Sequence, residues 1–138
     1  MADLLSHQRA VALQERCLRY ACCVRSFIRS LARYGVDRVD NEQLWRSSGS
    51  IGANYIEARE AMSRKDFLYR IRLSRKEARE SLFWLHVIHP SLHRNALEAW
   101  NAIVTETNEI ISIFTAIAKT TENNSSQLAQ NKSQVANR

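Results

Sequence analysis

The chain contains only three glycines and one proline in 138 residues. Because these two residue types supply most tight turns, a fold with many β-hairpins is hard to build from this composition. Apolar residues instead recur at intervals of three and four, which is the spacing of amphipathic helices. A chain of this length is expected to form one domain around one hydrophobic core. The sequence therefore predicts an all-α fold.

The first half of the chain predicts two helices. The first covers Leu4 to Tyr34 and ends at Gly35. The second begins at Asp40, whose carboxylate can cap free N–H groups while Gln43 reaches back as a capping box. It continues to about Ala61. Apolar and small residues follow two neighbouring faces of this helix, so we expect it to be buried on two sides.

The second half predicts two more helices and a polar tail. Ser63 and Asp66 repeat the cap pattern at the start of the third helix, which ends before Pro90. The fourth, about Ser91 to Lys119, has an apolar arc too wide for one neighbouring groove, so we expect it to meet a second surface. Short links make consecutive helices antiparallel, which predicts an up-down-up-down antiparallel four-helix bundle.

These expectations divide the chain into two parts. Residues 4–119 form the predicted four-helix-bundle domain. Residues 120–138 show no periodicity and have little apolar content. Such a segment cannot offset its ordering entropy by burial, so we predict a disordered polar C-terminal tail.

The sequence offers little for catalysis, metal binding or cofactors. His86, His89 and His93 have a spacing that invites a metal site, but Pro90 interrupts the helix and no carboxylate or cysteine lies near in sequence. Three separate imidazoles on a surface loop are the favoured interpretation. Glycine-rich phosphate loops, GxSxG and HExxH are all absent from the sequence. We therefore expect a protein that is not an enzyme, with no metal and no cofactor.

The cysteines and the hydropathy pattern indicate a compartment. Cys17, Cys22 and Cys23 are an odd number clustered on one helix, which does not suit a disulfide framework. No stretch approaches the roughly 18 uncharged apolar residues of a membrane span, and the N-terminus has no unbroken apolar signal region. A cytoplasmic protein without a membrane association is expected.

Positive charge points to acidic partners. The net charge is +6, and all of the 20 cations except Lys65, Lys76, Lys119 and Lys132 are arginine. The planar guanidinium fork of arginine matches phosphate and carboxylate groups. RNA or DNA is therefore the expected partner class.

One helix face combines cations with aromatic residues. At 100° per residue, four cations of the third helix fall on one arc opposite its core, with Tyr69 and Phe83 beside or within it. We take them as the candidate nucleic-acid-binding residues: Lys65, Arg72, Lys76 and Arg79. The alternative is a solvated surface in which Lys76 pairs with Glu80 and Phe83 fills a contact between subunits. Arg25, Arg29 and Arg33 on the first helix are the next candidates.

Small residues in the second helix require an explanation, because they lower helix propensity. Gly49 and Gly52 allow another helix to approach closely, and they lie on one stripe with Trp45 and Ile56. Polar residues occupy the remaining side, where they can hydrogen-bond the next helix or a neighbouring chain. They are Ser47, Ser50, Asn54 and Glu57.

The segment SIGANYIEA (residues 50–58) and the capped helix SRKDFLYRIRLSRKEARESLFWL (residues 63–85) resemble the bacterial four helix bundle protein family, also called the 23S rRNA intervening-sequence protein family. The resemblance covers about Arg46 to Lys119, and Ala58 stands where many members have glycine. The positions that match the motif or its helix packing are Ser50, Ile51, Gly52, Asn54, Ile56 and Glu57. The resemblance implies an up-down four-helix bundle, a ring-shaped homopentamer, an association with nucleic acid, and no catalytic residue.

Two functions remain open at this point. Apolar arcs on the second and fourth helices predict a homo-oligomer, and the resemblance favours five copies. Such an oligomer is expected to bind RNA or DNA through the basic face. Alternatively it is a scaffold or accessory protein for another protein, and its charge serves only solubility.

Overall fold

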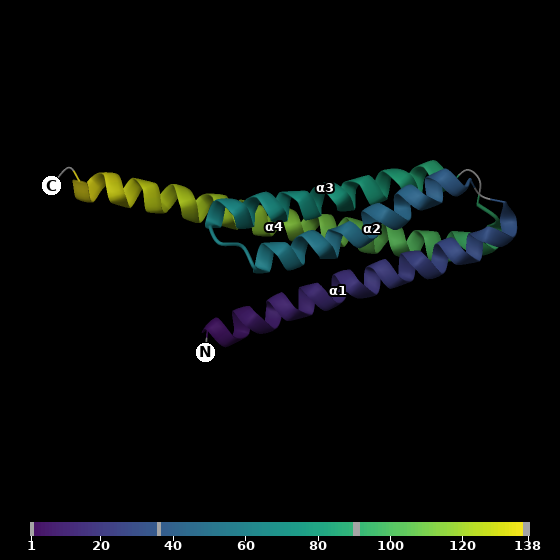
Figure 1. The fold of residues 1–138 in the computed structure, drawn as a ribbon, viewed down its shortest axis with the longest axis horizontal. Coiled ribbons are helices and arrows are strands. Elements are labelled where there is room, and N and C mark those ends of the chain that lie inside the picture. The colour runs from purple at the N-terminus through teal and green to yellow at the C-terminus, as the bar shows by residue number, and fades with distance from the viewer. Residues whose placement is uncertain (1, 36, 90–91, 137–138) are drawn as a thin grey trace.

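The computed structural model describes residues 2–35, 37–89 and 92–136, which contain four α-helices, two short 3-10 helices and no strand. In chain order these are α1 (Ala2–Leu31), η1 (Ala32–Tyr34), α2 (Arg38–Arg59), α3 (Arg64–Ile88), η3 (Arg94–Ala96) and α4 (Leu97–Ala136). Consecutive helices run in opposite directions along one common axis (Figure 1). The predicted all-α, up-down-up-down four-helix bundle is confirmed.

Local sequence signals set most helix ends. Gly35 follows η1 in the left-handed conformation, with φ of 66°, which glycine adopts without steric cost. Ser63 caps α3 by accepting a 3.0 Å hydrogen bond from the backbone N–H of Asp66, as predicted. The predicted cap of α2 at Asp40 is wrong. Asp37 caps this helix and accepts a 2.7 Å hydrogen bond from the N–H of Val39.

The beginning of α4 also differs from the prediction. Pro90 and Ser91 lie outside the described residues, and the chain first forms η3 before α4 begins at Leu97. His93 precedes η3, and its Nδ1 accepts a 3.3 Å hydrogen bond from the N–H of Asn95. A histidine cap and one turn of 3-10 helix thus replace the first turn expected for α4.

The bundle core is aliphatic and aromatic, and it uses the predicted faces of the helices. On α2, one of the two neighbouring faces expected from the sequence is fully inside. Its residues are Leu44, Ser48, Ile51, Tyr55 and Ala58. Much of the wide apolar arc of α4 packs within this bundle. Trp100, Ile103, Ile110 and Phe114 are buried, and Val104, Ile111 and Ile117 pack partly buried against them. The expected contact of α4 with a second surface stays a prediction.

α2 and α3 pack through small polar residues. The hydroxyls of Ser47 and Ser81 lie 2.8 Å apart, and Ser74 Oγ donates a 3.0 Å hydrogen bond to the carbonyl of Ile51. All three serines are buried. Such contacts need close helix axes, because a serine side chain reaches only a short distance. Small residues therefore let α2 and α3 form a close helix pair.

α1 contributes apolar side chains to the core and adds polar contacts with α4. Its buried core residues are Cys17, Tyr20, Val24, Phe27 and Leu31. Arg16 forms a two-pronged ion pair with Glu106 of α4, at 2.6 and 2.9 Å. The hydroxyls of Tyr20 and Thr107 lie 2.7 Å apart. Burial is the main reason that the pKa of Tyr20 is raised to about 12, so this phenol is neutral at physiological pH. The N-terminal half of α1 then diverges from the bundle (Figure 1).

The C-terminal segment is helical where the sequence predicted a disordered tail. α4 continues beyond residue 119 to Ala136, past the end of the bundle (Figure 1). Arg72 of α3 binds Glu122 at 2.5 Å, and every described side chain from Ser126 onward is exposed. Helix propagation from a packed segment needs no new nucleus, and α4 contains no glycine or proline to stop it. The polar composition therefore yields an exposed helix at this position.

Exchanging each helical glycine of α2 for alanine tests the close approach of α1. Both Gly49→Ala and Gly52→Ala gain about 0.5–1 kcal/mol of backbone entropy in a helix interior. At Gly49 the new Cβ meets only the mobile end of Arg25, whereas at Gly52 it lies 3.2 Å from Cys17 Cβ. We expect Gly52→Ala to be less stable than Gly49→Ala by about 1 kcal/mol or more in urea unfolding. Equal stabilities would show that α1 does not press on Gly52.

Deleting the exposed end of α4 should leave the bundle intact. We expect removal of residues 126–138 to change the free energy of unfolding by less than about 0.5 kcal/mol, since every described side chain in this segment is exposed. Removal of residues 117–138 is the matched control, because it also takes away the buried Ala118 and the partly buried Ile117. Similar decreases in stability for the two truncations would contradict this description.

Candidate nucleic-acid interface

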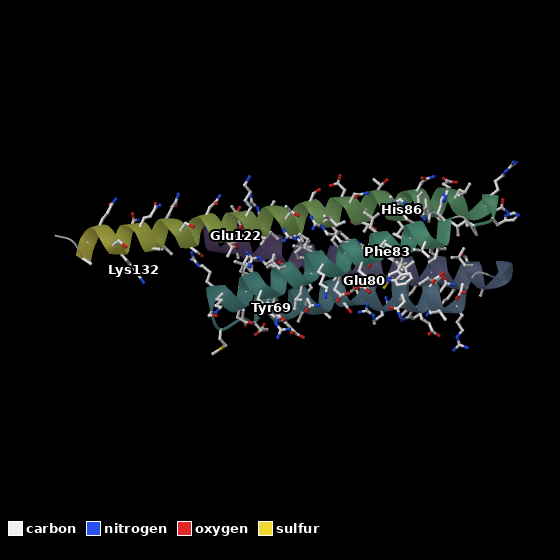
Figure 2. The ribbon with its side chains drawn as sticks, turned by 90° about the horizontal axis from the view of Figure 1, so that it is seen from above. Tyr69, Glu80, Phe83, His86, Glu122 and Lys132 are labelled. Atoms are coloured by element: carbon white, nitrogen blue, oxygen red, sulfur yellow. The ribbon has the colours of Figure 1, made fainter. Side chains whose placement is uncertain are left out.

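An exposed face of α3 carries all four predicted cations and both aromatic residues. At 100° per residue they fall within an arc of about 80°. We call this surface the α3 stripe, and it consists of Lys65, Tyr69, Arg72, Lys76, Arg79, Phe83 and Val87, each of which is exposed. Figure 2 shows Tyr69 and Phe83 spread along α3. The opposite face of α3 is buried, which turns the stripe outward.

Most cations of the stripe form no ion pair with a described carboxylate. Arg72 is paired with Glu122 of α4. Among the described carboxylates, none lies within ion-pair distance of Lys65, Lys76 or Arg79. Three of the four positive charges therefore remain available to an external anion.

The pairing of Lys76 with Glu80, considered from the sequence, is not formed. Glu80 instead binds Arg46 of α2, which also contacts Glu77 at 3.5 Å. Burial raises the pKa of Glu77, and the neighbouring Glu80 raises it further, while Arg46 opposes both effects. Arg46 thus draws these two carboxylates toward α2 and away from the α3 stripe.

The aromatic side chains of the stripe are accessible. Tyr69 is 56% exposed and Phe83 is 58% exposed. The guanidinium of Arg70 lies 5.7 Å from the centre of the Tyr69 ring, and Phe83 makes an edge contact with Trp84 at 5.1 Å. Each ring thus contacts a neighbouring side chain, and each residue keeps more than half of its surface in contact with solvent. Flat, accessible rings next to cations are the elements that stack on unpaired bases.

The alternative cations on α1 contact α2. Arg25 and Arg29 lie 4.6 and 5.5 Å from the ring centre of Trp45. Arginine stacked on an aromatic ring gains cation–π energy and stabilises helix packing. No sequence pattern predicts this contact, because Trp45 and the arginines belong to different helices. Arg33 is exposed beyond them.

The residues of the family motif have different roles in and around α2. Ile51 is fully buried, and Glu57 forms an ion pair with Arg70 of α3. Ser50 Oγ donates to the carbonyl of Arg46, and Asn54 Nδ2 donates to the carbonyl of Ser50, both at 2.9 Å. Ile51 and Glu57 thus join α2 to α3, whereas the hydrogen bonds of Ser50 and Asn54 lie within α2 and Gly52 faces α1.

An apolar patch lies across α1 and α2. Leu18 is 64% exposed and Ile56 is 47% exposed. They line a groove of about 320 Å³ whose floor includes Cys17, Gly49 and Gly52. Of the two sides on which α2 was expected to be buried, the second is therefore only partly covered by α1.

The histidines and cysteines show no shared site. His86 and His89 both pack against Trp100, with ring centres 5.4 and 4.4 Å from it. Among the described residues, no three His, Cys, Asp or Glu side chains are grouped closely enough to hold a metal ion. Burial raises the pKa of the Cys17 thiol to about 12, so it packs as a small apolar residue. Cys22 and Cys23 are exposed free thiols.

The helices do not have the character of membrane spans. In the part of the chain that the structure describes, none of them combines the length and the apolar content that crossing a bilayer requires.

Comparison with known proteins yields an informative match among solved structures. No family model and no curated protein matches the chain. Among solved structures it is similar to the crystal structure of a protein with unknown function from the S23 ribosomal protein family of Bacteroides thetaiotaomicron. The two share 29% sequence identity with a TM-score of 0.70, over 78% of this chain and 98% of that chain. This match and the observed bundle confirm the family resemblance: the chain is similar in fold and sequence to a protein of the S23 ribosomal protein family.

Proposed function

We propose that this protein is a non-enzymatic, homo-oligomeric helical bundle that binds RNA or DNA through the α3 stripe. The observation that carries the proposal is the exposure of cations and aromatic rings on one arc of a rigid helix. Its exposed thiols at Cys22 and Cys23 suit a reducing compartment, and we propose the cytoplasm.

The chemistry of the stripe favours unpaired nucleic acid. Cations along a helix neutralise phosphates and release counterions, which makes binding strong at low salt and weak at high salt. Aromatic rings stack on any base, so they add affinity without reading the sequence. From Lys65 to Phe83 the stripe extends about 27 Å at 1.5 Å per residue. Single-stranded RNA or DNA is therefore the better ligand, because its bases are free to stack.

Two sets of variants separate the roles of the cations and the rings. Lys65→Gln, Lys76→Gln and Arg79→Gln together should weaken binding to any single strand and reduce the salt slope by about 0.7 for each phosphate that is no longer neutralised. Tyr69→Ala with Phe83→Ala should weaken binding by about 1–3 kcal/mol per stacked base and leave the salt slope unchanged. Fluorescence anisotropy over a salt series measures both quantities.

A control that removes the same amount of charge tests the position of the site. Arg38→Gln, Lys119→Gln and Lys132→Gln together remove three exposed cations outside the stripe. They should leave binding nearly unchanged. Equal weakening in both triple variants would mean that net charge alone attracts the strand. Unchanged binding in the stripe variant would reject the stripe and turn attention to Arg25, Arg29 and Arg33.

The proposed oligomer forms through the apolar patch of Leu18 and Ile56. Large exposed aliphatic side chains over a groove floored by glycines are characteristic of an interface. A second chain that covers this patch would remove both side chains from water. Each added subunit would repeat the α3 stripe, so contacts of modest strength would add up to useful affinity.

Light scattering tests the assembly. At micromolar concentration we expect a mass several times the 15.9 kDa of one chain, with five copies favoured by the family resemblance. Leu18→Glu with Ile56→Glu should give single chains, because two buried carboxylates would be unpaired. Leu128→Glu with Val135→Glu is the matched control, since these apolar residues are exposed on the far end of α4. A mass of one chain for the unaltered protein would reject the proposal.

A further inference from the structure

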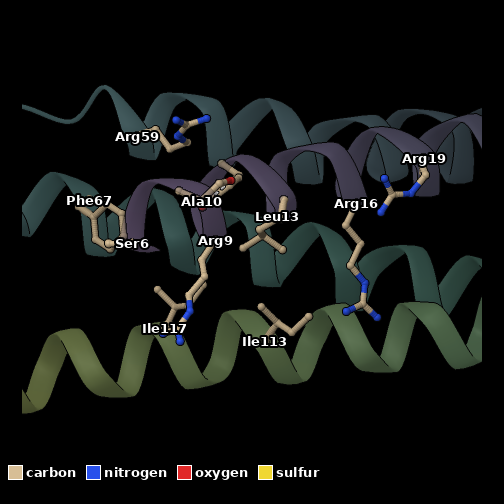
Figure 3. A pocket seen from close by; sticks show the side chains of 12 residues that line it. Ser6, Arg9, Ala10, Leu13, Arg16, Arg19, Arg59, Phe67, Ile113 and Ile117 are labelled. Atoms are coloured by element: carbon tan, nitrogen blue, oxygen red, sulfur yellow. Dashed lines mark hydrogen bonds between the residues drawn. The ribbon is translucent and has the colours of Figure 1, made fainter. Parts of the chain in front are cut away.

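A groove opens where α1 diverges from α4. The two helices are joined by the contacts of Arg16 with Glu106 and of Tyr20 with Thr107. Toward the N-terminus of α1 they separate, and a groove of about 610 Å³ lies between them (Figure 3). The groove is separate from the α3 stripe, and nothing in the proposed function uses it.

The floor of the groove is apolar. Leu13 from α1, Phe67 from α3, and Ile113 and Ile117 from α4 line it (Figure 3). All four side chains are partly buried, so each keeps some apolar surface in contact with water. An apolar depression with a polar rim is characteristic of a binding site.

The rim of the groove is positively charged. The arginines that line it are Arg9, Arg16, Arg19 and Arg59. Among the described side chains that line the groove, none is acidic. Arg16 is neutralised by Glu106, and Arg59 donates a 2.5 Å hydrogen bond to the uncharged amide of Gln14. Within the described residues, no carboxylate lies at ion-pair distance from Arg9, Arg19 or Arg59. The rim therefore attracts negative charge.

The shape of the groove fits one face of a helix. Its α1 wall extends from Ser6 to Arg19, about 20 Å at 1.5 Å per residue, which matches a helix of three to four turns. Apolar residues at i, i+3, i+4 and i+7 of such a helix would cover the floor, and acidic residues beside them would meet the arginines. We propose that the groove binds an amphipathic helix of a partner protein that carries acidic residues next to its apolar face.

Other occupants fit less well. Nucleic acid would bring phosphates to the rim, but the aliphatic floor of Leu13, Ile113 and Ile117 offers no flat ring for a base. A second copy could supply the exposed end of α4 as a free helix. That segment carries Leu128, but its one acidic residue, Glu122, is paired with Arg72. Neither matches both the floor and the rim.

Designed peptides and the full-length protein test this proposal. One labelled 16-residue helical peptide has leucines at i, i+3, i+4 and i+7 with flanking glutamates. A comparison peptide has the same leucines and a lysine in place of every glutamate. We expect the glutamate peptide to bind at micromolar concentration and the lysine peptide at least about tenfold more weakly, which corresponds to about 1.4 kcal/mol. Fluorescence anisotropy reports both affinities.

Variants of the protein assign the binding to the groove. Arg9→Gln with Arg19→Gln should weaken the glutamate peptide about tenfold, because both side chains are exposed on the rim. Arg33→Gln with Arg38→Gln removes the same charge elsewhere and should have little effect. Ile113→Ala should weaken both peptides, since it removes part of the floor. Circular dichroism confirms that each variant is folded.

Four outcomes would overturn the proposal. The first is equal binding of the two peptides, and the second is no binding of either at millimolar concentration. The third is displacement of the peptide by single-stranded RNA whose binding requires Arg9 and Arg19. That result would make the groove a nucleic-acid site. The fourth is self-association that is abolished in Arg9→Gln with Arg19→Gln, which would make a second copy the occupant. Loss of RNA binding in the α3 stripe variants leaves this proposal unaffected.

Discussion

The close packing of α2 on α3 is the constraint on which the rest of the bundle depends. Buried hydroxyls of Ser47, Ser74 and Ser81 find their hydrogen-bond partners between these helices, so no water is needed to satisfy them. Larger side chains would push the helices apart and leave those groups unpaired. With α2 held this close to α3, the buried face of α3 is fixed, and so is the direction in which its exposed face points.

α1 packs on the helix pair with its C-terminal half, where Val24, Phe27 and Leu31 are buried, while no described side chain of its N-terminal half is fully buried. It rests on Gly52 and joins α4 through polar contacts toward one end. The three candidate binding surfaces therefore lie on different parts of the molecule. The α3 stripe is displayed by the rigid pair, the apolar patch lies where α1 crosses α2, and the arginine-rimmed groove lies where α1 leaves α4.

Sequence patterns predicted the features that depend only on residues near one another in the chain. The cap at Ser63 needs only its neighbour Asp66, and the buried faces need only helical periodicity, so both were predictable. Asp37 and Asp40 have the same capping chemistry, and only the path of the chain after Gly35 decides between them. The polar composition predicted disorder beyond residue 119, whereas α4 continues to Ala136. Composition does not account for helix propagation, in which a packed helix extends without forming a new nucleus. The ion pairs of Arg46 and the α1–α4 groove each involve residues of different helices. The spacing of residues within one helix therefore does not predict them.

The sparse attachment of α1 also divides the molecule by local stability. The N-terminal half of this helix has few buried side chains, so its backbone hydrogen bonds should open without unfolding of the other three helices. Amide hydrogen exchange would then be fast in this half of α1 and slow in α2 and α3. The wall of the groove is thus the least protected helix face of the bundle, and a ligand held against it would raise the free energy of local opening there. Protection of these amides would report occupancy of the groove even by a ligand that leaves the global stability almost unchanged.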